Sequence, residues 1–142
     1  MQMAQYLGKA QRFSVTVRGG YDAVQESGQK IEFGENRKLT LSRPDNRLRI
    51  EGEHSDGAKL LTVFNGKEIT LIDGRANVYA TAPQAGSLDD TIIHFVRDLG
   101  VRLPLAAMLL SRLPAELEER LRSIDYVEKT SIHGAPAHHL AV

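Results

Sequence analysis

The stretch Lys-Leu-Thr-Leu-Ser-Arg-Pro-Asp-Asn-Arg-Leu-Arg-Ile-Glu, residues 38–51, decides the fold of this chain. Leu39 and Leu41 alternate with polar residues before the Pro-Asp-Asn tripeptide, and Leu48 and Ile50 do the same after it. Alternation with a period of two is typical of a strand with one apolar and one polar face. Because turn-favouring residues separate the two runs, this stretch predicts a pair of antiparallel strands.

The same pattern extends outward from this stretch, over residues 12–81. Turn-favouring residues divide it at intervals of about 8–12 residues, at Gly19-Gly20, Ser27-Gly28, Pro44-Asp45-Asn46, Asp56-Gly57, Asn65-Gly66 and Asp73-Gly74. We therefore predict a meander of about seven antiparallel strands before residue 82. Asn65-Gly66 is the strongest of these signals, because both residues tolerate the positive φ of a two-residue type I′ hairpin. Residues 58–64 and 67–72 carry apolar side chains on both faces, which predicts a central hairpin covered on both sides.

The period changes at residues 82–86, where Pro and Gly break the strand pattern. Ser87 and Asp90 have the spacing of a capping box, and an apolar stripe of helical period follows up to Leu99, before Gly100. A second short apolar segment, Leu105 to Leu110, follows Pro104. We predict a further helix from Pro114 or Ala115 to Arg122. Extended runs follow at Ile124 to Thr130 and Ala135 to Val142, joined by a turn around His133-Gly134.

The helical part is unusually rich in large apolar side chains. They crowd between residues 88 and 113: Leu88, Ile92, Phe95, Val96, Leu99, Leu103, Leu105, Met108, Leu109, Leu110 and Leu113. Such side chains need an apolar surface, and the dry face of the meander is the only large one available. We therefore predict an α+β fold, mainly antiparallel β, in which a curved sheet carries a short helical lid on its concave face. The interior is then either filled or hollowed into a pocket.

Composition excludes several classes of protein. The 142 residues fit one domain, and 18 basic residues balance 18 acidic ones, which does not favour nucleic-acid binding. The chain has no cysteine, so it has neither disulfides nor a thiol nucleophile. No apolar run is long enough to span a membrane, and residues 1–11 lack the pattern of a secretory signal. We expect either a cytosolic protein or one whose signal peptide has been removed.

The polar residues do not favour a metal site or an enzyme active site. His138 and His139 are adjacent in a predicted strand, so their side chains face opposite ways, and the other histidines have no ligand-like spacing. No nucleophile elbow or phosphate-binding loop is present, and we expect Ser111 to act as a cap and Asp89 to favour a helix N-terminus. Basic side chains interleaved with acidic ones predict a solvated strand face: Arg37, Lys38, Arg43, Arg47 and Arg49.

An ordered series of short motifs resembles a known family. They are Arg43-Pro44-Asp45-Asn46-Arg47-Leu48-Arg49, Phe64-Asn65-Gly66-Lys67 with Ile69-Thr70-Leu71, Asn77-Val78-Tyr79-Ala80, Leu103-Pro104-Leu105-Ala106 and the His133 to Ala141 segment. Together, over most of the chain, they resemble the predicted periplasmic proteins of domain-of-unknown-function family 2092. That family in turn resembles the lipoprotein carriers LolA and LolB and the envelope-stress regulator RseB.

The resemblance implies a LolA-like fold, an open antiparallel half-barrel with helices inside its concave face. It also implies a periplasmic location, a signal peptide in the full gene product, and an apolar cavity. Family members continue past the His-Leu-Ala segment with further strands. We therefore expect residues 1–142 to be one domain that lacks C-terminal strands of the family, and an unpaired strand edge that invites homodimers.

Two functional hypotheses follow, and neither is enzymatic; a third, an enzyme, would need a polar cleft that holds a carboxylate close to a histidine. In the first, a periplasmic carrier holds a lipoprotein acyl chain or another apolar small molecule between sheet and lid, without a cofactor or metal. The expected ligand-binding side chains are Tyr79, Leu88, Ile92, Phe95, Leu99, Met108 and Leu109. In the second, the interior is filled by the protein's own side chains, and the chain is a protein-interaction or envelope-sensing module.

Overall fold

The computed structural model describes residues 2–100, 103, 105–132 and 134–141. Residues Pro104, His133 and Val142, which bound predicted elements, lie outside this described part. The helices are α1 (Gln2–Lys9), α2 (Leu88–Arg97), the 3₁₀ helix η1 (Ala106–Leu109) and α3 (Leu113–Arg120). The strands are β1 (Arg12–Val24), β2 (Lys30–Ser42), β3 (Arg47–His54), β4 (Lys59–Phe64), β5 (Glu68–Asp73), β6 (Val78–Pro83), β7 (Asp125–Ile132) and β8 (Ala135–Ala141).

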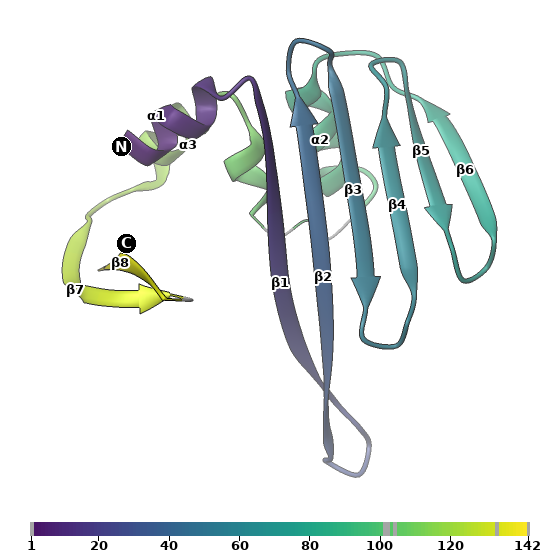
Figure 1. Ribbon diagram of the computed structural model, residues 1–142, viewed down its shortest axis with the longest axis horizontal. Helices are drawn as coiled ribbons and strands as arrows, with labels where there is room; N and C mark the ends of the chain where they lie inside the picture. Colours follow the sequence, from purple (N-terminus) through teal and green to yellow (C-terminus); the bar gives the residue numbers. More distant parts are fainter. Residues whose placement is uncertain (1, 101–102, 104, 133, 142) are drawn as a thin grey trace.

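Strands β1 to β6 form one antiparallel sheet in chain order, and β7 and β8 form a separate hairpin (Figure 1). The α+β class and the predominance of antiparallel pairing are thus confirmed. The six-stranded sheet is open, with β1 and β6 as its edges, and the described strands form no closed barrel. The hairpin lies to the side of the sheet, beyond α1 and α3 (Figure 1).

The meander has six strands instead of seven, because Gly19-Gly20 is not a turn. Both glycines lie within β1 and pair with Glu35 and Gly34 of β2. Glycine accepts an extended backbone as readily as a turn, so the pair does not interrupt the strand. The result is a long β1–β2 hairpin that projects past the end of β3 (Figure 1).

The connection at Asn65-Gly66 also differs from the predicted type I′ turn. Three residues, Asn65, Gly66 and Lys67, separate β4 from β5, and only the glycine of the Asn-Gly pair has positive φ, +95°. The Asn65 side-chain oxygen instead accepts hydrogen bonds from the backbone N–H groups of Lys67 and Glu68, both at 3.0 Å. A side-chain-supported turn replaces the two-residue hairpin loop.

One face of the sheet carries the core, because the register places apolar side chains from neighbouring strands on that side. Leu41 pairs with Leu48, and Leu48 pairs with Phe64 in the next strand. Helix α2 lies across this face (Figure 1), and Leu88, Ile92 and Phe95 complete the cluster. Within the β4–β5 hairpin, Phe64 and Ile69 are buried, whereas Leu60, Leu71 and Ile72 are exposed, so the prediction of cover on both sides is wrong.

Helix α2 begins at the predicted capping box. The Ser87 hydroxyl accepts the Asp90 backbone N–H at 3.2 Å, and the Asp90 carboxylate accepts the Ser87 backbone N–H at 2.9 Å. The hydrogen bond from the Ser87 hydroxyl, with help from the Ser87 N–H, lowers the pKa of Asp90. The helix ends at Arg97, and Gly100 follows with a φ of +62°, which favours glycine.

The far end of α2 predicts a pH-dependent contribution to stability. Hydrogen bonds from Arg97 and then His94 lower the pKa of Asp98 from 3.8 to about 2. Because the folded state has the lower pKa, the stabilisation is complete above pH 3.8 and is lost as the pH falls toward 2. We expect Asp98→Asn to be less stable than the parent protein at pH 6, with the difference narrowing between pH 4 and 2. Urea unfolding across this range measures it, and a constant difference would contradict the assignment.

Candidate functional site

A cavity of about 360 Å³ lies between α1, the first half of β1 and η1. Its volume is within the range of about 300–1,000 Å³ typical of small-molecule sites. Its wall is almost entirely apolar and includes Leu7, Phe13, Val17, Leu39, Met108 and Leu109, with Tyr6, Val15 and Leu105 at exposed positions. A cavity with this lining suits an apolar ligand better than a polar one.

The strand period explains how β1 forms one wall. Phe13, Val15 and Val17 alternate along the strand, so all three side chains stand on the core face of the sheet. Phe13 pairs with Leu41, and Val15 pairs with Leu39, which are both buried. The outer edge of β1 is open to solvent, because β1 pairs with β2 only.

The opposite wall is α1, which sequence reasoning missed. This helix is held close to the loop before α3, since a Cβ at Gly8 would lie 2.7 Å from the Ser111 carbonyl oxygen. Its signal was present, because Met3, Tyr6 and Leu7 have the i, i+3, i+4 spacing of a helical stripe. Only Tyr6 and Leu7 of these line the cavity.

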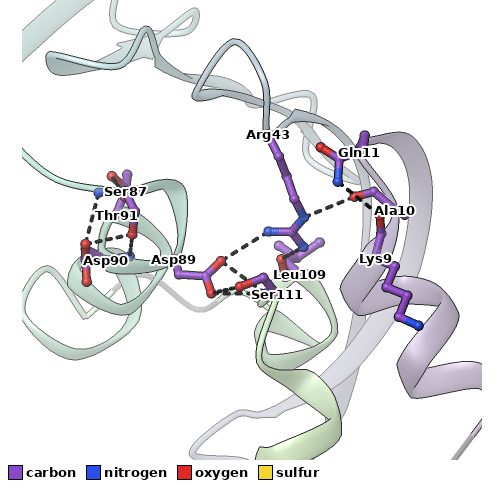
Figure 2. A network of polar contacts seen from close by, with 10 residues as sticks. All are labelled: Lys9, Ala10, Gln11, Arg43, Ser87, Asp89, Asp90, Thr91, Leu109 and Ser111. Atoms are coloured by element: carbon purple, nitrogen blue, oxygen red, sulfur yellow. Dashed lines mark hydrogen bonds and ion pairs between the residues drawn. The ribbon is translucent and has the colours of Figure 1, made fainter.

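A partly buried arginine, Arg43, joins the walls of the cavity to the sheet (Figure 2). The Arg43 guanidinium donates to the Ala10 carbonyl at 3.0 Å, to the Leu109 carbonyl at 2.8 Å and to Asp89 at 3.2 Å. The Arg43 and Asp89 side chains are only 13% and 18% exposed. One side chain after β2 therefore fixes the end of α1, the start of α2 and the end of η1.

The Asp89 carboxylate is the second centre of this network. It accepts the Ser111 backbone N–H at 3.0 Å and the Ser111 hydroxyl at 2.7 Å (Figure 2). The prediction that Arg43 belongs to a solvated strand face is therefore wrong. The prediction that Ser111 acts as a cap is also wrong, because the N-cap of α3 is Arg112 and no side chain caps that helix. Ser111 and Asp89 instead cross-link the segment before α3 to the first turn of α2.

The seven predicted ligand-binding residues fall in four different places. Met108 and Leu109 line the cavity. Leu88, Ile92 and Phe95 are buried in the core beneath α2, where side chains from β2, β3 and β4 pack around them. Leu99 follows the end of α2 and is 44% exposed.

Tyr79 lies apart from the others, on β6. Tyr79 pairs with Ile72 of β5. The core residue Ile69, also in β5, pairs with Ala82 of β6. Positions 79 and 82 have opposite parity along β6, so the Tyr79 side chain stands on the face away from α2. The tyrosine is 76% exposed there.

Further apolar side chains stand on the core face outside the helices and the cavity, separated from the core on β2 by the Arg37–Glu35 ion pair of 2.9 Å. By register, the exposed ones are Tyr21 and Ile31 on the β1–β2 hairpin and Leu60, Leu71 and Val78 on β4, β5 and β6. Tyr21 stacks on Phe33 across the projecting β1–β2 hairpin, with ring centroids 5.7 Å apart. Exposed apolar side chains gathered on one face are typical of a binding surface.

The histidines form no comparable centre in the part of the chain that the structure describes. His138 and His139 pair with Lys129 and Glu128 on the β7–β8 hairpin, and His94 binds Asp98 at the end of α2. Among the described residues, no group of three His, Asp or Glu side chains is arranged to hold a metal ion.

The fold and the cavity define a small α+β domain with an apolar pocket at one sheet edge. The chain belongs to domain-of-unknown-function family 2092, described as predicted periplasmic proteins, and the family model matches residues 1–142. No curated protein and no solved structure matches this chain. Among the described residues, no helix has the length and apolar character needed to cross a bilayer.

Proposed function

We propose that this protein binds an apolar ligand, such as an acyl chain, in the cavity between α1, β1 and η1. The observation that carries the proposal is the apolar cavity of about 360 Å³. A periplasmic location agrees with the family description. The likeness to the lipoprotein carriers, with a curved half-barrel sheet and a helical lid, is part of the same proposal.

The distribution of burial supports this position for the ligand. Beneath α2 the side chains of Ile92 and Phe95 are fully packed, so that part of the lid serves as core. Between α1 and η1, by contrast, Val15 and Leu105 keep 38% and 62% of their surface exposed. Covering such side chains with an acyl chain is favourable by about 25 cal/mol per Å² of apolar surface removed from water.

The lid in this proposal is α1 together with η1. Hydrogen bonds from Arg43 reach both, through the Ala10 and Leu109 carbonyl oxygens. Movement of either element away from β1 widens the cavity, and the bonds to Arg43 return it to the closed position. Entry and release then need no covalent chemistry.

An aspartate in the cavity wall is the direct test. We expect Val15→Asp to weaken the binding of a fluorescent fatty acid at least tenfold, because the ligand would bury a carboxylate. Thr16→Asp is the matched control, since the neighbouring residue on β1 faces the other side of the sheet. Fluorescence titration gives both affinities, and circular dichroism verifies the fold of each variant. Equal affinities for the two variants would place the ligand elsewhere.

The β7–β8 hairpin favours a second candidate, a protein-interaction module. Ile124, Tyr126, Val127, Ile132 and Leu140 are all about half exposed on or beside this two-stranded sheet. An isolated hairpin is marginally stable, so its apolar side chains and free edges suit pairing with a second copy of the chain. A concentration-dependent dimer in analytical ultracentrifugation, together with no uptake of any apolar probe, would favour this function over ligand binding.

A further inference from the structure

We propose that the ligand is a single-chain amphiphile with an anionic head group, held with its tail in the cavity and its head beside Lys9 and Arg12. This inference rests on the proposed function and specifies its ligand class. It assigns a role to the outer surface of α1, which an apolar tail alone would not use.

A second, polar depression adjoins the apolar cavity. It has a volume of about 510 Å³ and is lined by Gln2, Gln5, Tyr6, Lys9, Ala10 and Arg12. Tyr6 is a wall of both hollows. Because Tyr6 and Lys9 are three residues apart on α1, their side chains are neighbours on the helix surface. An extended molecule that passes Tyr6 therefore leaves an apolar environment and enters a polar one.

The charge of this second hollow is positive. The charged residues among the first 21 are Lys9, Arg12 and Arg18, and all are basic. Arg12 is engaged, through Asp45 at 3.1 Å and Ser42 at 3.2 Å. Lys9 has no ion pair among the described residues, and its side chain points away from the Arg43 network (Figure 2). Its ammonium group is therefore available for a carboxylate or phosphate head.

The arrangement separates the two parts of an amphiphile as their solvation requires. The tail contacts Phe13, Val15 and Met108, from which water is partly excluded. The head stays at the surface and avoids the cost of burying a charge. Exposed ion pairs are weak, so the head group sets selectivity between ligands while the tail supplies most of the affinity.

The test compares four ligands of equal chain length: dodecanoate, dodecyl phosphate, dodecanol and dodecylamine. Each displaces a fluorescent fatty acid from the purified protein at low salt. We expect both anions to bind about 2–5-fold more tightly than the alcohol, and the amine to bind most weakly. Charge reversal with Lys9→Glu should weaken the anions by a similar factor and leave the alcohol unchanged. Lys30→Glu, at the far end of the β1–β2 hairpin, is the matched control and should change neither.

The outcomes separate this inference from the proposed function. If the alcohol binds as tightly as the anions, or Lys9→Glu weakens all four ligands equally, the anionic head group is wrong and the apolar cavity stands. If none of the four ligands displaces the probe and the probe itself does not bind, both proposals fall. Tighter binding of dodecyl phosphate than of dodecanoate would assign the head as a phosphate.

Discussion

Replacement of Phe95 with alanine is expected to lower the free energy of unfolding by about 3–5 kcal/mol. The Phe95 ring is 0% exposed and lies between α2 and the sheet, in contact with the core formed by β2, β3 and β4. Its removal loses apolar burial and leaves a cavity that the rigid sheet closes only in part. For a domain whose total stability is about 5–15 kcal/mol, this is a large fraction. Urea unfolding followed by circular dichroism measures the change.

Val96 provides the matched control for Phe95. It is the next residue of α2 and is 42% exposed. We expect Val96→Ala to change the stability by no more than about 0.5 kcal/mol, since surface substitutions away from special features have small effects. Equal losses for the two variants would show that α2 does not dock on the sheet through the face described above.

The second large effect is expected for Arg43→Met. This change retains much of the side-chain volume but leaves Asp89 without its cationic partner and removes donors from the Ala10 and Leu109 carbonyl oxygens. Breaking a buried pair by removing one partner costs about 3–5 kcal/mol, and partial exposure places this pair at about 3 kcal/mol. The same unfolding experiment measures it. We also expect weaker binding of an apolar probe, because η1 loses its tie to the sheet.

Arg49→Met is the control that shows whether the loss of stability is specific to Arg43 or follows the loss of any arginine. Arg49 pairs with Glu51 on β3, and its side chain is 51% exposed. An exposed pair contributes about 0–1 kcal/mol, so this variant should remain close to the parent protein. A double-mutant cycle between Arg43→Met and Asp89→Asn then gives the coupling energy of the buried pair directly. A coupling energy near zero would contradict the assigned role of Arg43.

Elements set by local chemistry could be predicted from the sequence. The Ser87–Asp90 capping box depends on residues three apart, and the structure contains both of its hydrogen bonds. The turns at Ser27-Gly28 and Asp56-Gly57 use glycines at φ +82° and +83°, where other residues are strained. Period-two alternation gave the correct face for Leu39, Leu41, Leu48 and Ile50.

Features that depend on distant parts of the chain could not be predicted in this way. Arg43 reads as one member of a basic strand, because its partners lie 33, 46 and 66 residues away. Gly19-Gly20 reads as a turn, because nothing local shows that β2 is long enough to pair with it. The cavity requires α1 and η1, about 100 residues apart in the chain, to lie beside the same part of β1, which only tertiary packing determines. For this reason Tyr6 and Leu7 of the cavity wall were missed, whereas Met108 and Leu109, which also line it, were predicted from their apolar character alone.

The strand order has a consequence for how the molecule opens. Each strand of the main sheet is hydrogen-bonded only to its neighbours in the chain, so the meander with α2 docked on it can persist as one cooperative unit when α1 and η1 open. The segments that border the cavity, α1 and η1, are attached to this unit mainly through Arg43 and a few apolar contacts. Amide protons of η1 should therefore exchange with solvent through a partial opening, while those of β2 and β3 exchange only when the whole domain unfolds.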